Sequence, residues 1–272
     1  MIPFGIYLHW PFCRSKCPYC DFASFPARKI DFPAWEKAYV RCLEAYAVRT
    51  EGKTVSTIFF GGGTPSLMPP ELTAALLAAI RLWPVDSGVE ISMEANPGTL
   101  DALKMGGFAA AGINRLSIGV QALNDTDLKF LGRLHDTETA LEALRNARNI
   151  FAEVSADFIY ARPNQTLESW KQELERILEL NLSHLSLYQL TLEEGTFFHK
   201  KGLELPEEEL AAYEGNIYYI DQAAIDRADE ADSDDPEATA FYSKMENATN
   251  AVIKADAEEH KHPENMEEPV PV

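Results

Sequence analysis

Strand-like and helical segments alternate along most of the chain, and this alternation restricts the possible folds more than any other feature. The strand-like runs cover residues 5–10, 55–60, 89–95, 115–121, 153–160 and 183–190. Helical apolar spacing follows at residues 32–49, 69–83, 100–112, 137–151 and 167–181. Regular alternation of this kind indicates a parallel sheet with helical crossovers. Because such crossovers are right-handed, we expect an α/β fold whose sheet curls into a (βα)6 partial or full TIM-type barrel.

Residue types suited to chemistry gather where the predicted strands end. A cluster of cysteines follows the first strand, and Gly61–Gly63 follow the second. Glu94, Gln121 and Asp157 lie at or near the ends of the next three strands. Ligands of parallel α/β folds bind at the carboxyl ends of the strands. We therefore expect these side chains to form one site.

The distribution of charge divides the chain into two parts. Residues 1–205 carry 24 acidic and 20 basic side chains, whereas residues 206–272 carry 19 acidic and 4 basic ones. We expect a globular domain over residues 1–205 and an acidic, partly helical and partly disordered extension over residues 206–272. Neither part is basic enough to suggest nucleic-acid binding. No apolar run reaches the roughly 18–20 residues that span a bilayer, so we expect no stable membrane insertion.

Cys13, Cys17 and Cys20 form the pattern C-x3-C-x2-C. The start of the chain has no secretory signal, so we expect a cytoplasmic protein whose clustered thiols serve metal binding or catalysis. Three thiolates can hold three irons of a cubane cluster and leave the fourth iron open. A zinc site with His9 as fourth ligand and a chance group of free thiols are alternatives that the spacing leaves open. Cys42 lies in a helical segment and is expected to be a small core residue.

The glycine triplet is a second signal. Without side chains, Gly61–Gly63 allow backbone to approach a ligand closely. The segment is neither a P-loop nor a G-x-G-x-x-G motif. A tight turn after a strand explains the triplet equally well.

Seven blocks along the chain together resemble the radical S-adenosylmethionine (SAM) superfamily. They are "YLHWPFCRSKCPYCDF", "TIFFGGGTPSLM", "EANPGTL", "RLSIGVQALND", "LGRLHD", "DFIYARPNQTLESW" and "HLSLYQLTLEEGT". Within the superfamily they resemble the oxygen-independent coproporphyrinogen III oxidase-like group, and most closely its heme chaperone branch. The resemblance covers about residues 3–205 and implies a [4Fe–4S] cluster held by Cys13, Cys17 and Cys20. It also implies that SAM chelates the open iron and that an electron from the cluster can cleave SAM to a 5′-deoxyadenosyl radical.

The resemblance further implies which residues contact SAM. The matching positions are Tyr7, Tyr19, Gly62, Gly63, Thr64, Glu94, Gln121, Arg133, Asp157 and Tyr188. Glu94 and the glycine loop suit the ammonium group of SAM, and Arg133 suits its carboxylate. Gln121 and Asp157 suit the ribose hydroxyls, and Tyr19 can pack on the adenine. His9 and His135 are expected to serve the same site.

Two sequence features help to decide which branch of this group the chain resembles. Coproporphyrinogen-oxidising members carry an extra cysteine after the third ligand, where this chain has Asp21-Phe22. The resemblance therefore implies a heme chaperone, which binds heme and passes it to an acceptor protein. That branch normally continues into a domain with a His-Asn-x-x-Tyr-Trp motif tied to heme, and this sequence has no such motif. A coproporphyrinogen oxidase and a truncated, inactive family member therefore stay open as alternatives.

The expected partners follow from the same resemblance. They are heme, a heme-accepting protein, and an electron donor such as a flavodoxin or an NADH-dependent system. His260 and His262 lie in the acidic extension, where we expect them to be solvated. The extension itself is interpreted as a solvated segment, with docking to a basic partner as the alternative.

Overall fold

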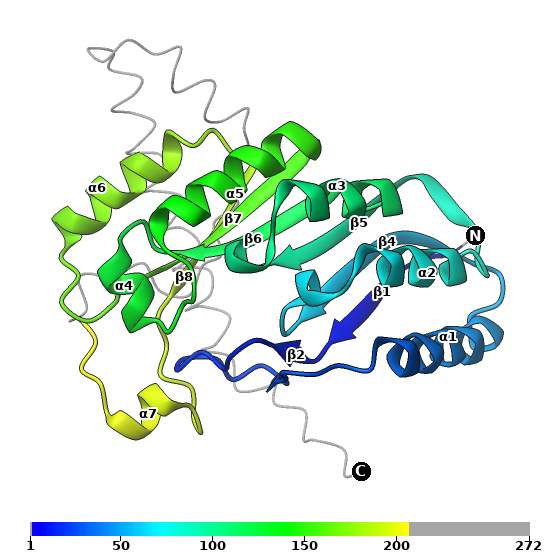
Figure 1. The fold of residues 1–272 in the computed structure, drawn as a ribbon, viewed down its shortest axis with the longest axis horizontal. Helices are drawn as coiled ribbons and strands as arrows, with labels where there is room; N and C mark the ends of the chain where they lie inside the picture. Colours follow the sequence, from blue (N-terminus) through cyan, green and yellow to red (C-terminus); the bar gives the residue numbers. More distant parts are fainter. Residues whose placement is uncertain (1, 207–272) are drawn as a thin grey trace, which may run out of the picture.

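A six-stranded parallel sheet organises the molecule (Figure 1). The computed structural model describes residues 2–206. Its sheet strands are β1 Ile2–Trp10, β4 Lys53–Gly62, β5 Val85–Ala95, β6 Arg115–Gln121, β7 Glu153–Tyr160 and β8 His184–Gln189. They pair in chain order, so β1 and β8 are the two edges of this sheet. The predicted α/β fold with a partial barrel of parallel strands is confirmed.

Helices connect successive strands of this sheet. They are α1 Phe32–Arg49, α2 Pro70–Ile80, α3 Ala102–Ala111, α5 Thr137–Ile150 and α6 Leu167–Leu178. Side chains cap their first turns where the sequence changes from loop to apolar periodicity. Asp31 accepts a hydrogen bond from the amide of Ala34 in α1, and Thr166 forms a capping box with Ser169 in α6. Figure 1 shows α1, α2, α3 and α5 along one side of the sheet.

Several short elements were not expected from the sequence. They are the helices α4 Asp125–Phe130 and α7 Phe197–Lys201, the strands β2 Phe12–Cys13 and β3 Phe25–Pro26, and 3-10 turns at Pro65–Leu67 and Pro97–Thr99. Their place near the strand ends makes them part of the rim that holds the site described below. The predicted acidic extension covers residues 206–272, of which residues 207–272 lie outside the described residues.

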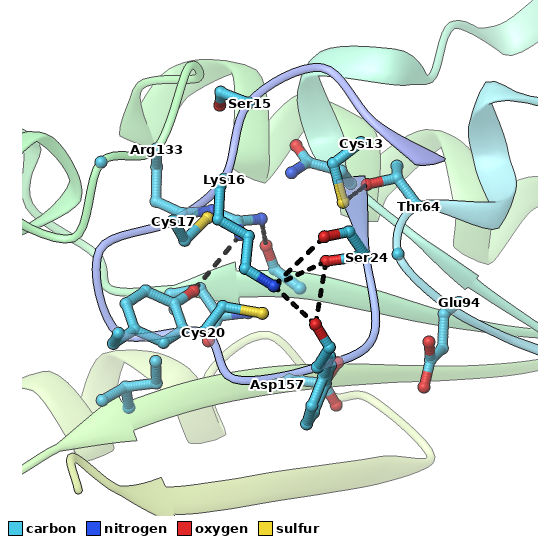
Figure 2. A pocket seen from close by; sticks show the side chains of 18 of the residues that line it. Cys13, Ser15, Lys16, Cys17, Cys20, Ser24, Thr64, Glu94, Arg133 and Asp157 are labelled. Carbon is cyan, nitrogen blue, oxygen red and sulfur yellow. Dashed lines mark hydrogen bonds between the residues drawn. The ribbon is translucent and has the colours of Figure 1, made fainter. Parts of the chain in front are cut away.

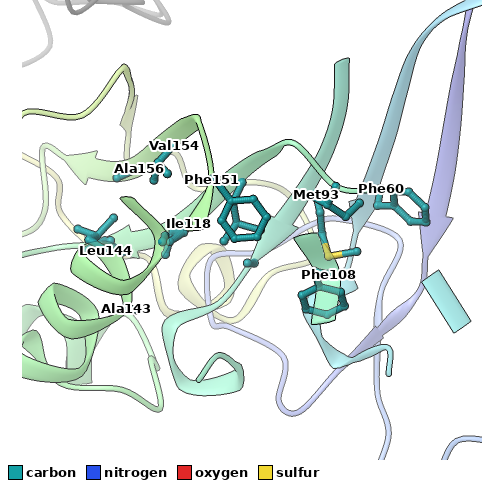
Figure 3. Packing of buried hydrophobic residues seen from close by; sticks show 14 of the residues in the cluster. Phe60, Met93, Phe108, Ile118, Ala143, Leu144, Phe151, Val154 and Ala156 are labelled. Carbon is teal, nitrogen blue, oxygen red and sulfur yellow. The ribbon is translucent and has the colours of Figure 1, made fainter. Parts of the chain in front are cut away.

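The two faces of the sheet differ in polarity because successive strand residues point to opposite sides. The helix-covered face holds the main core, in which Trp10, Phe60 and Met93 are fully buried. Figure 3 shows Phe60, Met93 and Phe108 packed together in this core. On the opposite face, four neighbouring strands carry serines, namely Ser92, Ser117, Ser155 and Ser186.

Two further observations complete the fold. Cys42 is exposed on α1, so the expectation that it is a core residue is wrong. Its helix packs on the sheet through other positions, including the buried Leu43. Within residues 2–206, no helix is both long enough and apolar enough to cross a bilayer.

Candidate functional site

A pocket of about 450 Å³ lies where the sheet strands end, and Figure 2 shows many of its side chains. Its lining includes Cys13, Cys17, Tyr19, Cys20, Gly62, Gly63, Thr64, Glu94, Gln121, Arg133, Asp157 and Tyr188. Three residues expected at the site, Tyr7, His9 and His135, lie outside this lining. Tyr7 is 57% exposed on β1, and its hydroxyl lies 3.1 Å from Nδ1 of His9. The sheet therefore brings together side chains that are up to 175 residues apart, from Cys13 to Tyr188.

The three cysteines lie on one loop whose base is closed by the pairing of β2 with β3. The Cys20 amide donates to the Cys17 carbonyl at 3.2 Å, which forms a turn between two of the thiols. Thr64 Oγ1 lies 3.4 Å from Cys13 Sγ, and an Arg133 terminal nitrogen lies 3.7 Å from Cys17 Sγ. Thr64 and Arg133 thus place hydrogen-bond donors beside two of the three sulfurs.

The three thiols of the pocket match the number of protein ligands that a cubane with one open iron needs. Within residues 2–206, no three His, Cys, Asp or Glu side chains are close enough to hold one metal ion. Both ring nitrogens of His9 already have partners, Nδ1 at Tyr7 and Nε2 at the carbonyl of Ala23, 2.8 Å away. A single zinc ion needs every sulfur within about 2.3 Å of one point. A cubane places one thiolate on each of three irons, so three thiols around a shared pocket suit it.

The glycine loop runs directly against the start of the cysteine loop. The Gly63 amide donates to the Trp10 carbonyl at 2.6 Å. A Cβ at Gly62, whose φ is +112°, would lie 2.7 Å from His9. A Cβ at Gly63 would lie 2.7 Å from the Phe12 carbonyl oxygen. The glycines are therefore required by close backbone packing, which also exposes backbone to the pocket.

Glu94 places a carboxylate beside the glycine loop. Its Oε2 accepts a hydrogen bond from the Gly62 amide at 3.0 Å. Burial raises the pKa of Glu94 to about 7; the Gly62 hydrogen bond opposes this rise, and the nearby Asp157 adds to it. A bound cation would favour the ionised form of this carboxyl.

Arg133 supplies a positive charge on the opposite wall. One terminal nitrogen donates to the Gly119 carbonyl at 2.7 Å, and the other lies 3.4 Å from the Tyr19 hydroxyl. Its Nε is buried and has no hydrogen-bond partner among the described residues. An unpaired buried donor costs free energy, and an anionic ligand at this wall would satisfy it.

Asp157 and Gln121 lie on the β6–β7 side of the pocket. Ser117 Oγ lies 3.2 Å from an Asp157 carboxylate oxygen. Burial raises the pKa of Asp157, and hydrogen bonds from Ser186 and Ser117 oppose this rise. Gln121 has a φ of +77° and follows a register irregularity between β6 and β7. Both side chains offer hydrogen-bonding groups to a polar ligand.

The two tyrosines that line the pocket differ in their exposure to solvent. The Tyr19 ring packs beside Phe198, with ring centroids 6.5 Å apart, and burial raises the pKa of its phenol. Tyr188 is half-exposed on β8. The packing against Phe198 was not predicted, because α7 lies almost 180 residues after Tyr19 in the sequence.

Two residues of the cysteine loop were missed by sequence reasoning. Lys16 Nζ donates to the Phe22 carbonyl at 2.5 Å and to Ser24 Oγ at 3.0 Å. Arg14 donates to the Gly98 carbonyl at 2.9 Å, which ties the loop to the turn after β5. Both lie between cysteines, and that position was the only signal in the sequence.

The two histidines expected at the site do not line the pocket. His9 lies behind the glycine loop, as described above. His135 is buried, and its Nε2 lies 3.1 Å from the Val120 carbonyl oxygen. Burial and, to a smaller extent, the charge of Arg133 lower the pKa of His135 to about 4, so the ring is neutral at pH 7.

Comparisons with known proteins bear on the family and the fold of this chain. The model of the Radical SAM superfamily matches residues 7–177. The heme chaperone HemW of Escherichia coli (strain K12) is 38% identical over 210 residues, which are 76% of this chain and 56% of that protein. The mitochondrial radical S-adenosyl methionine domain-containing protein 1 of Bos taurus is 41% identical over 220 residues, 76% of this chain and 48% of that protein. This chain thus spans about half the length of these curated relatives.

A solved structure is also similar. The coproporphyrinogen III oxidase HemN from Escherichia coli matches with a TM-score of 0.70 at 29% identity. The match covers 77% of this chain and 50% of that one. A radical S-adenosylmethionine methyltransferase from Kitasatospora setae, TsrM, shares the fold alone, at 14% identity and a TM-score of 0.52.

Proposed function

Because this chain belongs to the radical SAM superfamily, we propose that it binds a [4Fe–4S] cluster and SAM in this pocket and acts as a heme chaperone. One observation carries the binding proposal. Three thiols, a glycine loop, a carboxylate and an arginine converge on one pocket at the carboxyl ends of a parallel sheet. These donor types match those that the resemblance to the superfamily implies for a [4Fe–4S] cluster and SAM.

The proposed roles follow from the chemistry of each group. Cys13, Cys17 and Cys20 would hold three irons of the cluster. When bound, the cluster supplies an electron to SAM. Glu94 and the glycine loop would bind the SAM ammonium group, and Arg133 its carboxylate.

The other wall of the pocket completes the SAM site. Gln121 and Asp157 would bind the ribose hydroxyls, because both offer polar atoms near strand ends. Tyr19 and Tyr188 line the same pocket and offer aromatic surface to the adenine. Tyr7 lies near Glu94 of this pocket. Burial raises the pKa of Tyr7, and the nearby carboxylate of Glu94 raises it to a smaller extent.

The heme chaperone assignment rests on the curated relatives. Two bacterial relatives named heme chaperone HemW are 38% and 39% identical to this chain. Asp21-Phe22 stands where coproporphyrinogen oxidases carry an extra cysteine, which favours the chaperone. Heme, a heme-accepting protein and an electron donor are therefore the proposed partners, and a reducing compartment such as the cytoplasm is the proposed location.

A second function has one observation in its favour. The HemN structure matches the fold of this chain over 77% of its length. A coproporphyrinogen oxidase is therefore the alternative. Its identity to this chain, 29%, is below that of the HemW relatives.

Cluster binding is tested by anaerobic reconstitution with iron and sulfide. Wild type is expected to take up about four irons per chain and to show the absorption and, after reduction, the electron paramagnetic resonance of a [4Fe–4S] cluster. Cys17→Ala is expected to lose both signals. Cys42→Ala is the matched control, because Cys42 is an exposed thiol on α1 outside the pocket, and should retain the cluster. Tight zinc binding without iron, or a full iron content in Cys17→Ala, would contradict the proposal.

A further inference from the structure

We infer that Arg162, a buried arginine behind the pocket, is a positioning residue that fixes the backbone of Gln121 at the SAM site. The inference rests on the proposed function for its consequence, which is the affinity for SAM. Its structural basis, described next, is independent of any cofactor.

The guanidinium of Arg162 joins the ends of two neighbouring strands. Arg162 is only 2% exposed. One terminal nitrogen donates to the carbonyl of Ile159 at 2.6 Å and also lies 3.4 Å from the carbonyl of Gln121. Ile159 and Gln121 both line the pocket, on β7 and β6 respectively. A single cation therefore holds two segments of the pocket wall from behind.

Two carboxylates hold this cation in place. The other terminal nitrogen pairs with Oε2 of Glu173, which is 7% exposed on α6. Arg162 Nε lies 2.9 Å from Oδ2 of Asp127 on α4. Glu173 also accepts the Leu123 amide on Oε1 at 2.7 Å. Arg162 and Glu173 thus contact the two ends of residues 121–123. The two ion pairs link this segment to α4 and α6.

The backbone at these strand ends needs such support. Gln121 has a φ of +77° and Ala161 a φ of +55°. L-residues rarely adopt these values, because Cβ then crowds the carbonyl oxygen. Strained backbone of this kind persists where the surroundings hold it in place. The ladder between β6 and β7 cannot do this alone, since its register is interrupted between Gly119 and Gln121.

A stabilising role and a positioning role of Arg162 predict different results. A buried ion pair is often replaced by apolar residues of similar volume without loss of stability, whereas removal of one partner leaves an unpaired charge. If Arg162 and Glu173 only stabilise the fold, the paired replacement Arg162→Met/Glu173→Gln, which removes both charges and keeps an acceptor for the Leu123 amide, will leave the pocket wall unchanged. If Arg162 positions Gln121, the wall will loosen even in a stable protein.

The first test needs no cofactor. Amide hydrogen exchange is measured on the 272-residue, cluster-free chain for wild type, Arg162→Met, Arg162→Met/Glu173→Gln and Arg148→Met. Faster exchange at residues 119–122 is expected in both Arg162 variants, with residues 58–62 unchanged. Arg148→Met is the matched control, because Arg148 also donates to a backbone carbonyl, that of Leu180, at 2.9 Å, but far from the pocket. Unchanged protection at residues 119–122 in the folded paired variant would overturn the inference.

The second test measures the dissociation constant of SAM on cluster-loaded protein, with Gln121→Ala as the partner mutation. Arg162→Met is expected to weaken SAM binding about three- to tenfold, as for one lost hydrogen bond. In the Gln121→Ala background the same change should have little further effect, because the side chain that Arg162 positions through the backbone is gone. An equal loss in both backgrounds would contradict positioning through Gln121. If wild type loads iron but binds no SAM, the proposed function fails while the exchange experiment still decides the role of Arg162.

Discussion

At the scale of single residues, Glu94 is a buried carboxyl that lowers the stability of the cofactor-free protein and suits the ammonium group of SAM. The carboxyl is largely buried, and burial raises its pKa to about 7. Ionising it inside the protein therefore costs more than ionising it in the unfolded chain. The ammonium group of a bound SAM would recover that cost, so the unfavourable group becomes useful once the ligand arrives.

Glu94→Gln is expected to stabilise the cofactor-free protein at alkaline pH. The folded pKa of about 7 lies above the ordinary 4.5, so the stability that wild type gains from this group is complete below 4.5 and is lost as pH rises through 7. The amide keeps an acceptor for Gly62 and carries no charge. We expect a gain of up to about 3 kcal/mol in the free energy of unfolding at pH 8 and a much smaller gain at pH 5, measured by urea denaturation.

The matched control is Glu142→Gln, an exposed carboxylate on α5, which should change stability little at either pH. Glu94→Gln should also weaken SAM binding in the loaded protein. Equal stability of Glu94→Gln and wild type at both pH values would show that burial of this carboxyl is not costly.

Residues in and around the pocket differ in how far the sequence predicts their position and role. Glu94 and Arg133 could be found, because one ends a strand and both match a family block. Arg162 could not, since its burial depends on the packing of α4 and α6 around it. Cys42 was wrongly expected in the core, because helical spacing alone does not show which side of α1 faces the sheet.

At the scale of elements, α7 acts on the cysteine loop from the far end of the described chain. The Phe198 amide donates to the Pro18 carbonyl at 3.0 Å. The Phe198 ring stacks on Phe130, with centroids 4.7 Å apart, and contacts Tyr19. Pro18 and Tyr19 lie between two of the cysteines, so this helix braces the turn that carries two proposed cluster ligands.

Phe198→Ala is expected to loosen that turn and to destabilise the protein. Removing a buried phenylalanine ring typically costs about 3–5 kcal/mol. Phe198 is 3% exposed, whereas its neighbour Phe197 is 56% exposed and provides the matched control. We expect a lower melting temperature and faster amide exchange at residues 17–20 for Phe198→Ala only. The same effect from Phe197→Ala would indicate that the helix as a whole, rather than the buried ring, matters.

Long elements were predicted better than short ones. The helix at residues 32–49 and the strands at 115–121 and 153–160 have the predicted boundaries. β5 begins earlier than expected, at Val85, in a stretch of exposed residues without apolar alternation. The six-residue α4 and five-residue α7 are too short to show helical periodicity, and their positions are set by contacts with the cysteine loop and the strand ends.

At the scale of the whole molecule, the main question is what the pocket serves. This chain spans about half the length of its curated relatives, which include both bacterial heme chaperones and mitochondrial proteins. Among residues 2–206 the structure provides the proposed cluster and SAM site. The expected acidic extension, with His260 and His262, has only residue 206 among the described residues, so its partly helical, partly disordered form and the solvated state of the two histidines stay predictions.

Heme titration and turnover separate the two proposed functions. We expect cluster-loaded protein to bind about one heme per chain and to leave coproporphyrinogen unchanged in the presence of SAM and a reductant. Heme binding is followed by its absorption and coproporphyrinogen by chromatography under anaerobic conditions. Anaerobic consumption of coproporphyrinogen with SAM cleavage would instead support the oxidase. Neither activity in a protein with an intact cluster would indicate an inactive family member.

The edges of the sheet have a mechanical consequence. In a closed barrel the hydrogen-bonded ring fixes the circumference, so the interior cannot widen without breaking strand pairs. Here β1 and β8 are terminal strands of an arc. Small changes in twist between adjacent strands can alter the radius of that arc while every ladder stays paired. The curvature of the serine-bearing face can therefore change without the loss of a strand pair.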